Sequence, residues 1–154
     1  MGSKPIAVGC DDAGLPLKLY VAEILSARGH EVTDYGCFND APVDYPDVAF
    51  AVAEAVGRGA HDRAVLVCGT GIGMAISANK VPGVRAAVAH DTYSAERARK
   101  SNNAQVLALG AKVIGFELAR MIVESWLDAD FGGGHSERKV NKISERERAL
   151  GTVA

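Results

Sequence analysis

The chain has 154 residues, of which 48% are hydrophobic and 23% charged. This composition is typical of one compact globular domain and excludes a wholly disordered chain. Its 17 Lys and Arg residues nearly balance 19 Asp and Glu residues, giving a net charge of -2, so we expect neither a nucleic-acid partner nor binding to an anionic membrane.

Five short runs rich in Val, Ile, Leu and Ala predict buried strands at 6–9, 31–35, 64–68, 85–89 and 105–109. Segments with helical apolar spacing alternate with them and predict helices at 17–28, 47–58, 73–79, 94–100 and 116–128. This alternation indicates a doubly wound α/β fold with a five-stranded parallel sheet covered on both faces. We read residues 1–154 as a single domain.

The last part of the chain follows a different pattern. Gly132-Gly133-Gly134 is expected to end the fifth helix, and a charged helical tail follows at 136–150. Its apolar positions, Val140, Ile143 and Leu150, are too few for a core helix. We therefore expect residues 135–154 to pack on a partner subunit.

The apolar runs are too short to span a membrane, and the first residues lack the apolar region of a signal peptide, so the sequence predicts a cytoplasmic protein. Three cysteines, Cys10, Cys37 and Cys68, show no C-x-x-C spacing. They predict neither a disulfide framework nor a metal site.

The segment Cys68-Gly-Thr-Gly-Ile-Gly73 lies between a predicted strand and a predicted helix, where sheets of this kind bind ligands. Its glycines leave backbone amides free to face an anion, and the positive helix end favours a thiolate at Cys68. A thiolate beside such amides suits proton abstraction next to a carbonyl, with the amides holding an enediolate. A tight turn with a buried, inert Cys68 explains the same residues equally well.

A dinucleotide site is the rival function for this segment. The G-x-G-x-x-G/A pattern needs Gly or Ala where Met74 stands, and the segment follows the third strand rather than the first. Asp91 nonetheless lies where a ribose-binding acid would be expected, so this alternative stays open.

Other polar residues follow the predicted strands. Asp11 and Asp12 can bind sugar hydroxyls or begin a helix, and Tyr45 can bring a phenol to the same edge or start the next helix beside Pro46. Four further basic residues are candidate phosphate ligands, but for each one considered alone a solvated surface position is the simpler interpretation. They are Lys112, His135, Arg138 and Lys139.

Together these segments resemble the type B ribose-5-phosphate isomerases and their galactose-6-phosphate and tetrose-phosphate isomerase relatives, from about residue 6 to about residue 143. The matching motifs are Gly-Cys-Asp-x-Ala-Gly at 9–14, Asp44-Tyr45-Pro46, the Val-Cys-Gly-Thr-Gly-Ile-Gly run at 67–73, Ala78-Asn79-Lys80, Tyr93-Ser94-Ala95 and Asn102-Asn103-Ala104-Gln105. The resemblance implies a Rossmann-like α/β/α sandwich and a homodimer or dimer of dimers. It also implies a small sugar phosphate as ligand, with no metal or organic cofactor.

The family interconverts aldoses and ketoses by proton transfer through a cis-enediolate. The resemblance makes Cys68 the base, Thr70 a helper in ring opening, Asp11 a hydroxyl ligand and Asn102 of the neighbouring subunit a substrate contact. It places the enediolate at Gly69, Gly71, Ile72 and Gly73, and the phosphate near Lys112, His135 and Lys139, with Arg138 beside them.

Two positions depart from the family pattern. Asp12 stands where the family carries a phosphate-binding histidine, and Ser101 where it carries the histidine that opens the furanose ring. A tetrose 4-phosphate cannot close that ring, because the oxygen needed is esterified. Residues 90–97 and 101–105 also look like the D-erythrulose 4-phosphate isomerases of erythritol and threitol catabolism.

We therefore expect isomerisation between D-erythrulose 4-phosphate and D-erythrose 4-phosphate. A ribose-5-phosphate or hexose-6-phosphate isomerase is the alternative within the enzyme class. A catalytically silent sugar-phosphate binding module is the alternative outside it.

Overall fold

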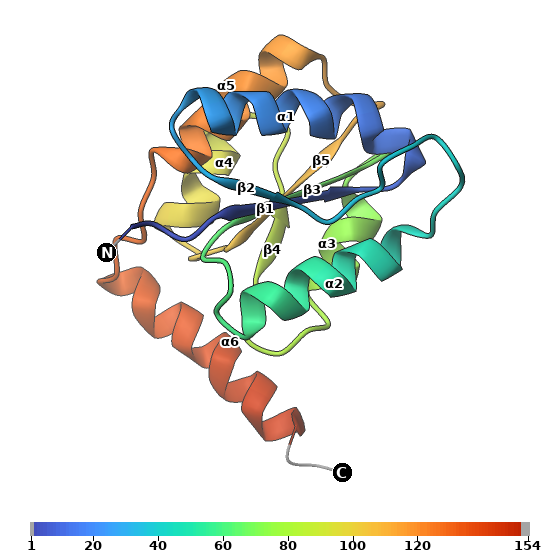
Figure 1. Cartoon of the computed structure of the whole chain (residues 1–154). Coiled ribbons are helices and arrows are strands. Elements are labelled where there is room, and N and C mark those ends of the chain that lie inside the picture. The colour runs from blue at the N-terminus through green and yellow to red at the C-terminus, as the bar shows by residue number, and fades with distance from the viewer. Residues whose placement is uncertain (1, 152–154) are drawn as a thin grey trace.

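The computed structural model describes residues 2–151. A five-stranded sheet with helices on both faces forms the body of the molecule (Figure 1). Its strands are β1 (Ile6–Cys10), β2 (Val32–Asp34), β3 (Ala64–Cys68), β4 (Ala86–Val88) and β5 (Val106–Gly110). The strand order is β2-β1-β3-β5-β4, and every neighbouring pair is parallel. The predicted α/β class and the five-stranded parallel sheet are confirmed.

The helices are α1 (Leu15–Ala27), α2 (Tyr45–Gly57), α3 (Ile72–Ala78), α4 (Thr92–Lys100), α5 (Phe116–Leu127) and α6 (His135–Gly151). Helices α1, α4 and α5 cover one face of the sheet, and α2 and α3 cover the other (Figure 1). Helices α1, α2 and α4 begin slightly before their predicted starts. Their first turns hold proline or polar residues, which carry no apolar periodicity.

The side chains of β3 alternate between two apolar cores. Val65 and Val67 join the core under α1 and α5, whereas Leu66 and Cys68 join the core under α2 and α3. All residues of β1, β3 and β5 are buried, as expected for strands covered on both faces. The alternation turns Cys68 toward α2 and α3.

The direction in which strands are added to the sheet reverses between β1 and β3. The chain places β2 on one side of β1 and β3 on the other, so the helices that follow β1 and β3 lie on opposite faces. A crevice forms at the carboxyl ends of two such strands. Those ends are Cys10, followed by Asp11, and Cys68, followed by Gly69.

Helix α5 ends earlier than the glycine triplet. It finishes at Leu127, where the Arg63 guanidinium donates hydrogen bonds to the carbonyls of Trp126, Leu127 and Ala129. These bonds tie the last carbonyls of α5 and the carbonyl of Ala129 to the residue that precedes β3. The expectation that the triplet ends this helix is therefore wrong; Gly133 and Gly134, at φ 63° and 61°, instead turn the chain toward α6.

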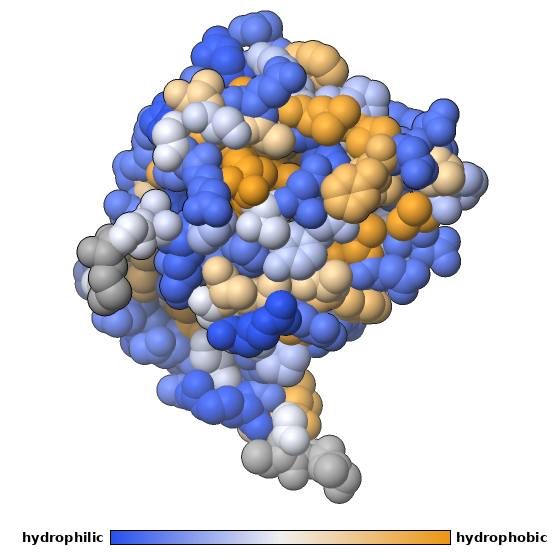
Figure 2. Space-filling model, in the orientation of Figure 1, coloured by the Kyte–Doolittle hydropathy of each residue, from blue (hydrophilic) through white to orange (hydrophobic). Residues whose placement is uncertain are grey.

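The predicted helical tail is present as α6, which extends away from the body (Figure 1). Within its described residues Val140 is buried, while Ile143 and Leu150 are 53% and 60% exposed. Figure 2 shows a largely hydrophilic surface on α6 with an apolar margin along one side. Packing of this helix on a partner stays a prediction. Within residues 2–151, none of the helices combines the length and the hydrophobicity needed to cross a bilayer.

A buried ion pair connects α1 to the end of β2. The Lys18 side chain is wholly buried, and its Nζ lies 2.8 Å from Oδ2 of Asp34, whose side chain is 29% exposed. The same Nζ donates a 2.7 Å hydrogen bond to the carbonyl of Cys37. The ammonium is thus removed from water and depends on these two acceptors.

We predict that Asp34→Ala lowers the free energy of unfolding by about 2–3 kcal/mol, because it leaves the Lys18 ammonium buried without its counter-ion. Asp128→Ala removes the partner of Arg28 in an exposed pair and should cost less than about 1 kcal/mol. Urea denaturation of both variants measures the difference. Equal losses would contradict the assigned role of the buried pair.

Candidate active site

A cavity of about 430 Å³ opens at the carboxyl ends of β1 and β3. Residues from the ends of β1 and β3, the loop after β3, helix α3, the start of α2 and the segment after β5 line it: Asp11, Tyr45, Cys68, Gly69, Thr70, Ile72, Gly73, Ile76 and Lys112. All except Ile76 are predicted site residues. The fold thus gathers them from distant parts of the sequence.

Cys68 lies at the base of this cavity, where its side chain is almost fully buried. The backbone N–H of Gly71 donates a hydrogen bond to its Sγ at 3.1 Å. Gly71 has φ 77° and is itself buried; a Cβ there would lie 2.9 Å from the carbonyl carbon of Leu109. A side chain at position 71 would therefore disturb the amide that donates to the Cys68 sulfur.

Asp11 brings a carboxylate to the same cavity from the end of β1. Its N–H donates to the carbonyl of Val67 at 3.2 Å, and its Oδ1 accepts a 3.0 Å hydrogen bond from Gly14. Burial raises the pKa of Asp11 above its usual range, while the Gly14 amide opposes this shift. The carboxylate is thus held beside β3, where it can accept hydrogen bonds from hydroxyl groups.

Tyr45 begins α2 and lies against the first turn of α3. A Cβ at Gly73 would approach the Tyr45 ring to 2.4 Å, so the absence of a side chain at position 73 lets the ring sit there. Tyr45 remains 40% exposed at the rim of the cavity. The contact fixes the phenol opposite the loop that carries Cys68.

Lys112 supplies a positive charge to the cavity lining. Its N–H donates to the carbonyl of Gly69 at 3.0 Å, and its Cδ would lie 3.7 Å from a Cβ at Gly69. The stem therefore runs beside the Cys68 loop and brings the ammonium toward the place where an anionic ligand would bind.

His90 supports the site from outside the cavity lining. Its Nε2 accepts a 2.9 Å hydrogen bond from the N–H of Gly110, so the neutral ring carries its proton on Nδ1. Burial lowers the pKa of His90, and the nearby Asp91 carboxylate opposes that shift. The neutral ring thus holds the end of β5, against which Gly71 packs.

Asp12 makes different contacts from its neighbour Asp11. Its Oδ1 accepts a 3.2 Å hydrogen bond from the N–H of Val43, and it is absent from the cavity lining. The bond fastens the segment that leads into Tyr45. Direct substrate binding by Asp12 stays a prediction.

Ser101 and Asn102 follow α4 and precede β5, so they lie at the amino end of the sheet. Cys68 lies at the carboxyl end of β3. The Ser101 hydroxyl accepts a 2.9 Å hydrogen bond from Nε of Arg97. Asn102 lines a separate cavity of about 240 Å³ together with Arg85 and Ile143. Within one chain, neither residue lines the Cys68 cavity.

The predicted phosphate ligands are likewise divided. Lys112 lines the cavity, whereas the exposed side chains of His135, Arg138 and Lys139 lie on α6. The structure of one chain does not bring them together with Lys112.

Ile76 is the lining residue that the sequence does not single out. It is 57% exposed and lies one helical turn after Ile72 on α3. The i, i+4 spacing is the signal that could have found it. For metals, residues 2–151 hold no cluster of three or more His, Cys, Asp or Glu side chains that could bind an ion.

We predict that Gly73→Ala displaces the Tyr45 ring and lowers kcat/KM for the expected substrate, D-erythrulose 4-phosphate, by about ten- to a hundredfold. Gly115→Ala is the matched control, because a Cβ at Gly115 meets nothing within 4 Å. Steady-state kinetics and thermal denaturation separate a local change from unfolding. Unchanged kinetics in Gly73→Ala would show that the position of the ring does not matter.

Comparison with known proteins agrees with this architecture. A family model described as Ribose/Galactose Isomerase matches residues 6–143. A D-erythrulose-4-phosphate isomerase of Pectobacterium atrosepticum is 56% identical over 144 residues, covering 92% of this chain and 94% of that protein. A ribose-5-P isomerase B of Listeria innocua is 51% identical over 140 residues, covering 91% and 95%.

The solved structure of Clostridium thermocellum ribose-5-phosphate isomerase B superposes with a TM-score of 0.93 at 47% identity, covering 95% of this chain and 99% of that one. By name all three relatives are sugar-phosphate isomerases, and similarity of this extent makes the chain an enzyme of that class. The chain belongs to the ribose/galactose isomerase family.

Proposed function

We propose that the enzyme interconverts D-erythrulose 4-phosphate and D-erythrose 4-phosphate, with Cys68 as the base. The observation that carries the chemistry is the Cys68 sulfur, which lines the cavity and accepts the Gly71 amide. Ser101 at the position of the family's ring-opening histidine favours an acyclic substrate. The name of the Pectobacterium atrosepticum relative supports the same choice.

In the proposed reaction, the Cys68 thiolate removes a proton from carbon 1 of the ketose. The C–H electron pair forms the C1=C2 double bond, and the carbonyl pair moves to the oxygen on carbon 2, which gives a cis-enediolate. The backbone amides of the segment from Gly69 to Gly73 stabilise that charge. The Cys68 thiol returns the proton to carbon 2, and the proton of the carbon 1 hydroxyl moves to the carbon 2 oxygen.

Binding groups surround this centre in the proposal. Asp11 accepts hydrogen bonds from substrate hydroxyls, Tyr45 closes one side of the cavity, and Lys112 attracts the phosphate. Thr70 borders the reacting carbons, although an acyclic sugar does not need the help in ring opening that the family resemblance assigns to it.

The complete site is proposed to contain two chains. Ser101 and Asn102 lie at the amino end of the sheet, and α6 carries its basic groups away from the body. A homodimer or dimer of dimers would bring Asn102, His135, Arg138 and Lys139 of one subunit to the Cys68 cavity of another. The cytoplasmic location expected from the sequence stays a prediction.

Two alternative functions, a pentose-phosphate isomerase and a silent binding module, can be distinguished by experiment. The Listeria innocua relative, a ribose-5-P isomerase B by name, favours a pentose substrate. A silent binding module would bind sugar phosphates without exchanging their carbon-bound protons with solvent.

We predict that Cys68→Ala lowers kcat by several orders of magnitude while sugar-phosphate binding persists, because the base takes part in bond breaking. Solvent deuterium should no longer enter the substrate beside the carbonyl. Cys10→Ala is the control, since Cys10 packs in the core under α1 and α5, and it should retain turnover. Near-normal exchange in Cys68→Ala would rule out this base.

We also predict a higher kcat/KM for D-erythrulose 4-phosphate than for D-ribulose 5-phosphate or D-ribose 5-phosphate. Ser101→His should raise the D-ribose 5-phosphate activity, because general acid–base help is worth about two to four orders of magnitude in rate. Ser26→His, on the exposed surface of α1, controls for an added imidazole. Faster turnover of D-ribose 5-phosphate by the unmodified enzyme would favour the pentose alternative.

A further inference from the structure

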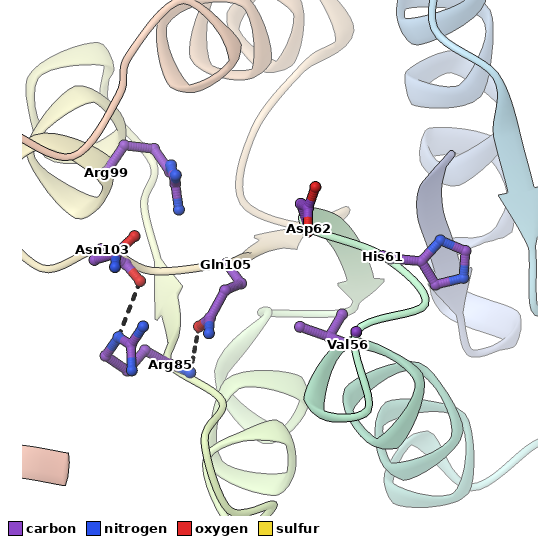
Figure 3. Close-up of a pocket in the computed structure, with 8 residues that line it drawn as sticks. Val56, His61, Asp62, Arg85, Arg99, Asn103 and Gln105 are labelled. Carbon is purple, nitrogen blue, oxygen red and sulfur yellow. Dashed lines mark hydrogen bonds between the residues drawn. The ribbon is translucent and has the colours of Figure 1, made fainter. Parts of the chain in front are cut away.

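A second cavity, of about 250 Å³ (Figure 3), is lined by residues that precede the strands and therefore lies at the amino end of the sheet, whereas the Cys68 cavity lies at the carboxyl end. Side chains near the starts of β3, β4 and β5 and from the end of α4 line much of it: His61, Asp62, Arg85, Arg99, Asn103 and Gln105. None of these residues has a role in the proposed isomerisation. The cavity therefore needs a separate explanation.

Arg99 is the most constrained of these groups. It is only 9% exposed, and its NH1 group donates a 2.9 Å hydrogen bond to the carbonyl of Ala104. Its buried Nε has no hydrogen-bond partner among residues 2–151. Burial lowers the pKa of Arg99 to about 10, and the positive charges of Arg63 and Arg85 act in the same direction, while the carboxylates of Asp130 and Asp62 oppose the shift.

Arg85 lines the same cavity. Its Nε donates a 2.9 Å hydrogen bond to the carbonyl of Asn103, which leaves its two terminal amino groups available. Burial lowers its pKa, while Glu147 opposes that shift. Across residues 2–151, neither Arg85 nor Arg99 forms an ion pair with a carboxylate.

The nearby acidic groups are already engaged. Asp62 pairs with Lys4 at 2.9 Å, and Asp130 pairs with Arg63 at 2.8 Å. Glu147, the carboxylate that acts on Arg85, accepts a 2.8 Å hydrogen bond from the N–H of Gly83. His61 bonds to the carbonyl of Pro5 at 2.7 Å and to the hydroxyl of Tyr35 at 2.8 Å. Figure 3 shows its ring on the far side of the pocket from the arginines.

Two partly desolvated guanidinium groups thus share a cavity without a paired acid. Removing a charge from water is costly unless an opposite charge or hydrogen bonds replace the lost solvation. Gln105 is neutral and brings no opposite charge; its Oε1 accepts the backbone N–H of Arg85, and its Nε2 donates to the carbonyl of Gly83.

We propose that this cavity binds a phosphate group between Arg85 and Arg99. Two guanidinium groups match the charge of a phosphate dianion better than that of a single carboxylate, and their planar N–H groups suit its oxygens. The phosphate can belong to the free ion or to a phosphate monoester. This site is separate from the proposed substrate phosphate site near Lys112, since one cavity lies at the amino end of the strands and the other at their carboxyl end.

The position of Arg99 connects this site to the proposed substrate contacts. Arg99 lies in the last turn of α4, directly before the segment that holds Ser101 and Asn102. Arg85 contacts the same segment through Asn103 and also lines the cavity of Asn102. A bound phosphate would hold this segment in place by linking β4 to the end of α4.

Calorimetric titration at constant ionic strength tests the proposal, with inorganic phosphate in one arm and glycerol 3-phosphate in the other. The proteins are the unmodified chain and its Arg99→Met, Arg85→Met and Lys112→Met variants, with Arg58→Met as a control for loss of an exposed arginine. We expect Arg99→Met and Arg85→Met each to weaken phosphate binding at this site at least about tenfold. Binding should persist in Lys112→Met and Arg58→Met.

Thermal denaturation gives a second readout. Arg99→Met removes an unpaired buried charge, so it should match or exceed the Tm of the unmodified chain in phosphate-free buffer. When phosphate is added, the Tm of Arg99→Met should rise less than that of the unmodified chain. The variant can bind phosphate only at the substrate site near Lys112, whereas the unmodified chain can bind it at both sites. A purely structural arginine would instead lower Tm on replacement in either buffer.

Phosphate binding that is unchanged in Arg85→Met and Arg99→Met, or that disappears in Lys112→Met alone, would overturn the proposal. If Arg99→Met fails to fold, Arg85→Met decides the outcome. Binding of both ligands would identify a monoester site, and binding of inorganic phosphate alone would identify a site for the free ion. Neither result depends on which sugar the enzyme isomerises.

Discussion

The close contact between the loop after β3 and the end of β5 fixes the geometry of the active site. Gly71 lies so near the backbone of Leu109 that a Cβ would come within 2.9 Å of it, and Lys112 donates to the carbonyl of Gly69. The sulfur of Cys68, the amide of Gly71 and the ammonium of Lys112 are therefore positioned by one backbone arrangement. Preorganisation of this kind stabilises charge without reorganisation during the reaction.

Much of this arrangement could be predicted from the sequence because it depends on local patterns. Buried strands such as β3 are short runs of apolar residues, and the Cys68 loop combines glycines with a cysteine at a strand end. Parallel topology then places Asp11 and Cys68 at the same edge. The resemblance to the isomerases rested on these same segments, and the family model covers them.

The features that the sequence did not reveal depend on contacts between distant residues. Nothing near Asp12 indicates that its carboxylate accepts the N–H of Val43. From the sequence, Lys18 would be expected on the surface of α1, whereas in the structure it is buried beside Asp34. Arg85 and Arg99 lie on separate elements, and only the assembled sheet brings them to one cavity. A near-neutral net charge likewise conceals how unevenly the charges are distributed.

The strand order has a consequence for how the chain acquires its active site during synthesis. Strands β1, β2 and β3 can pair as soon as they leave the ribosome, but β5 must insert between β3 and β4, which precede it in the chain. Until Leu109 and Gly110 arrive, the Cys68 loop has no backbone to pack against. Contacts between distant parts of a chain form late and slowly. A nascent chain that ends before β5 would therefore carry the Cys68 sulfur without the backbone that positions it.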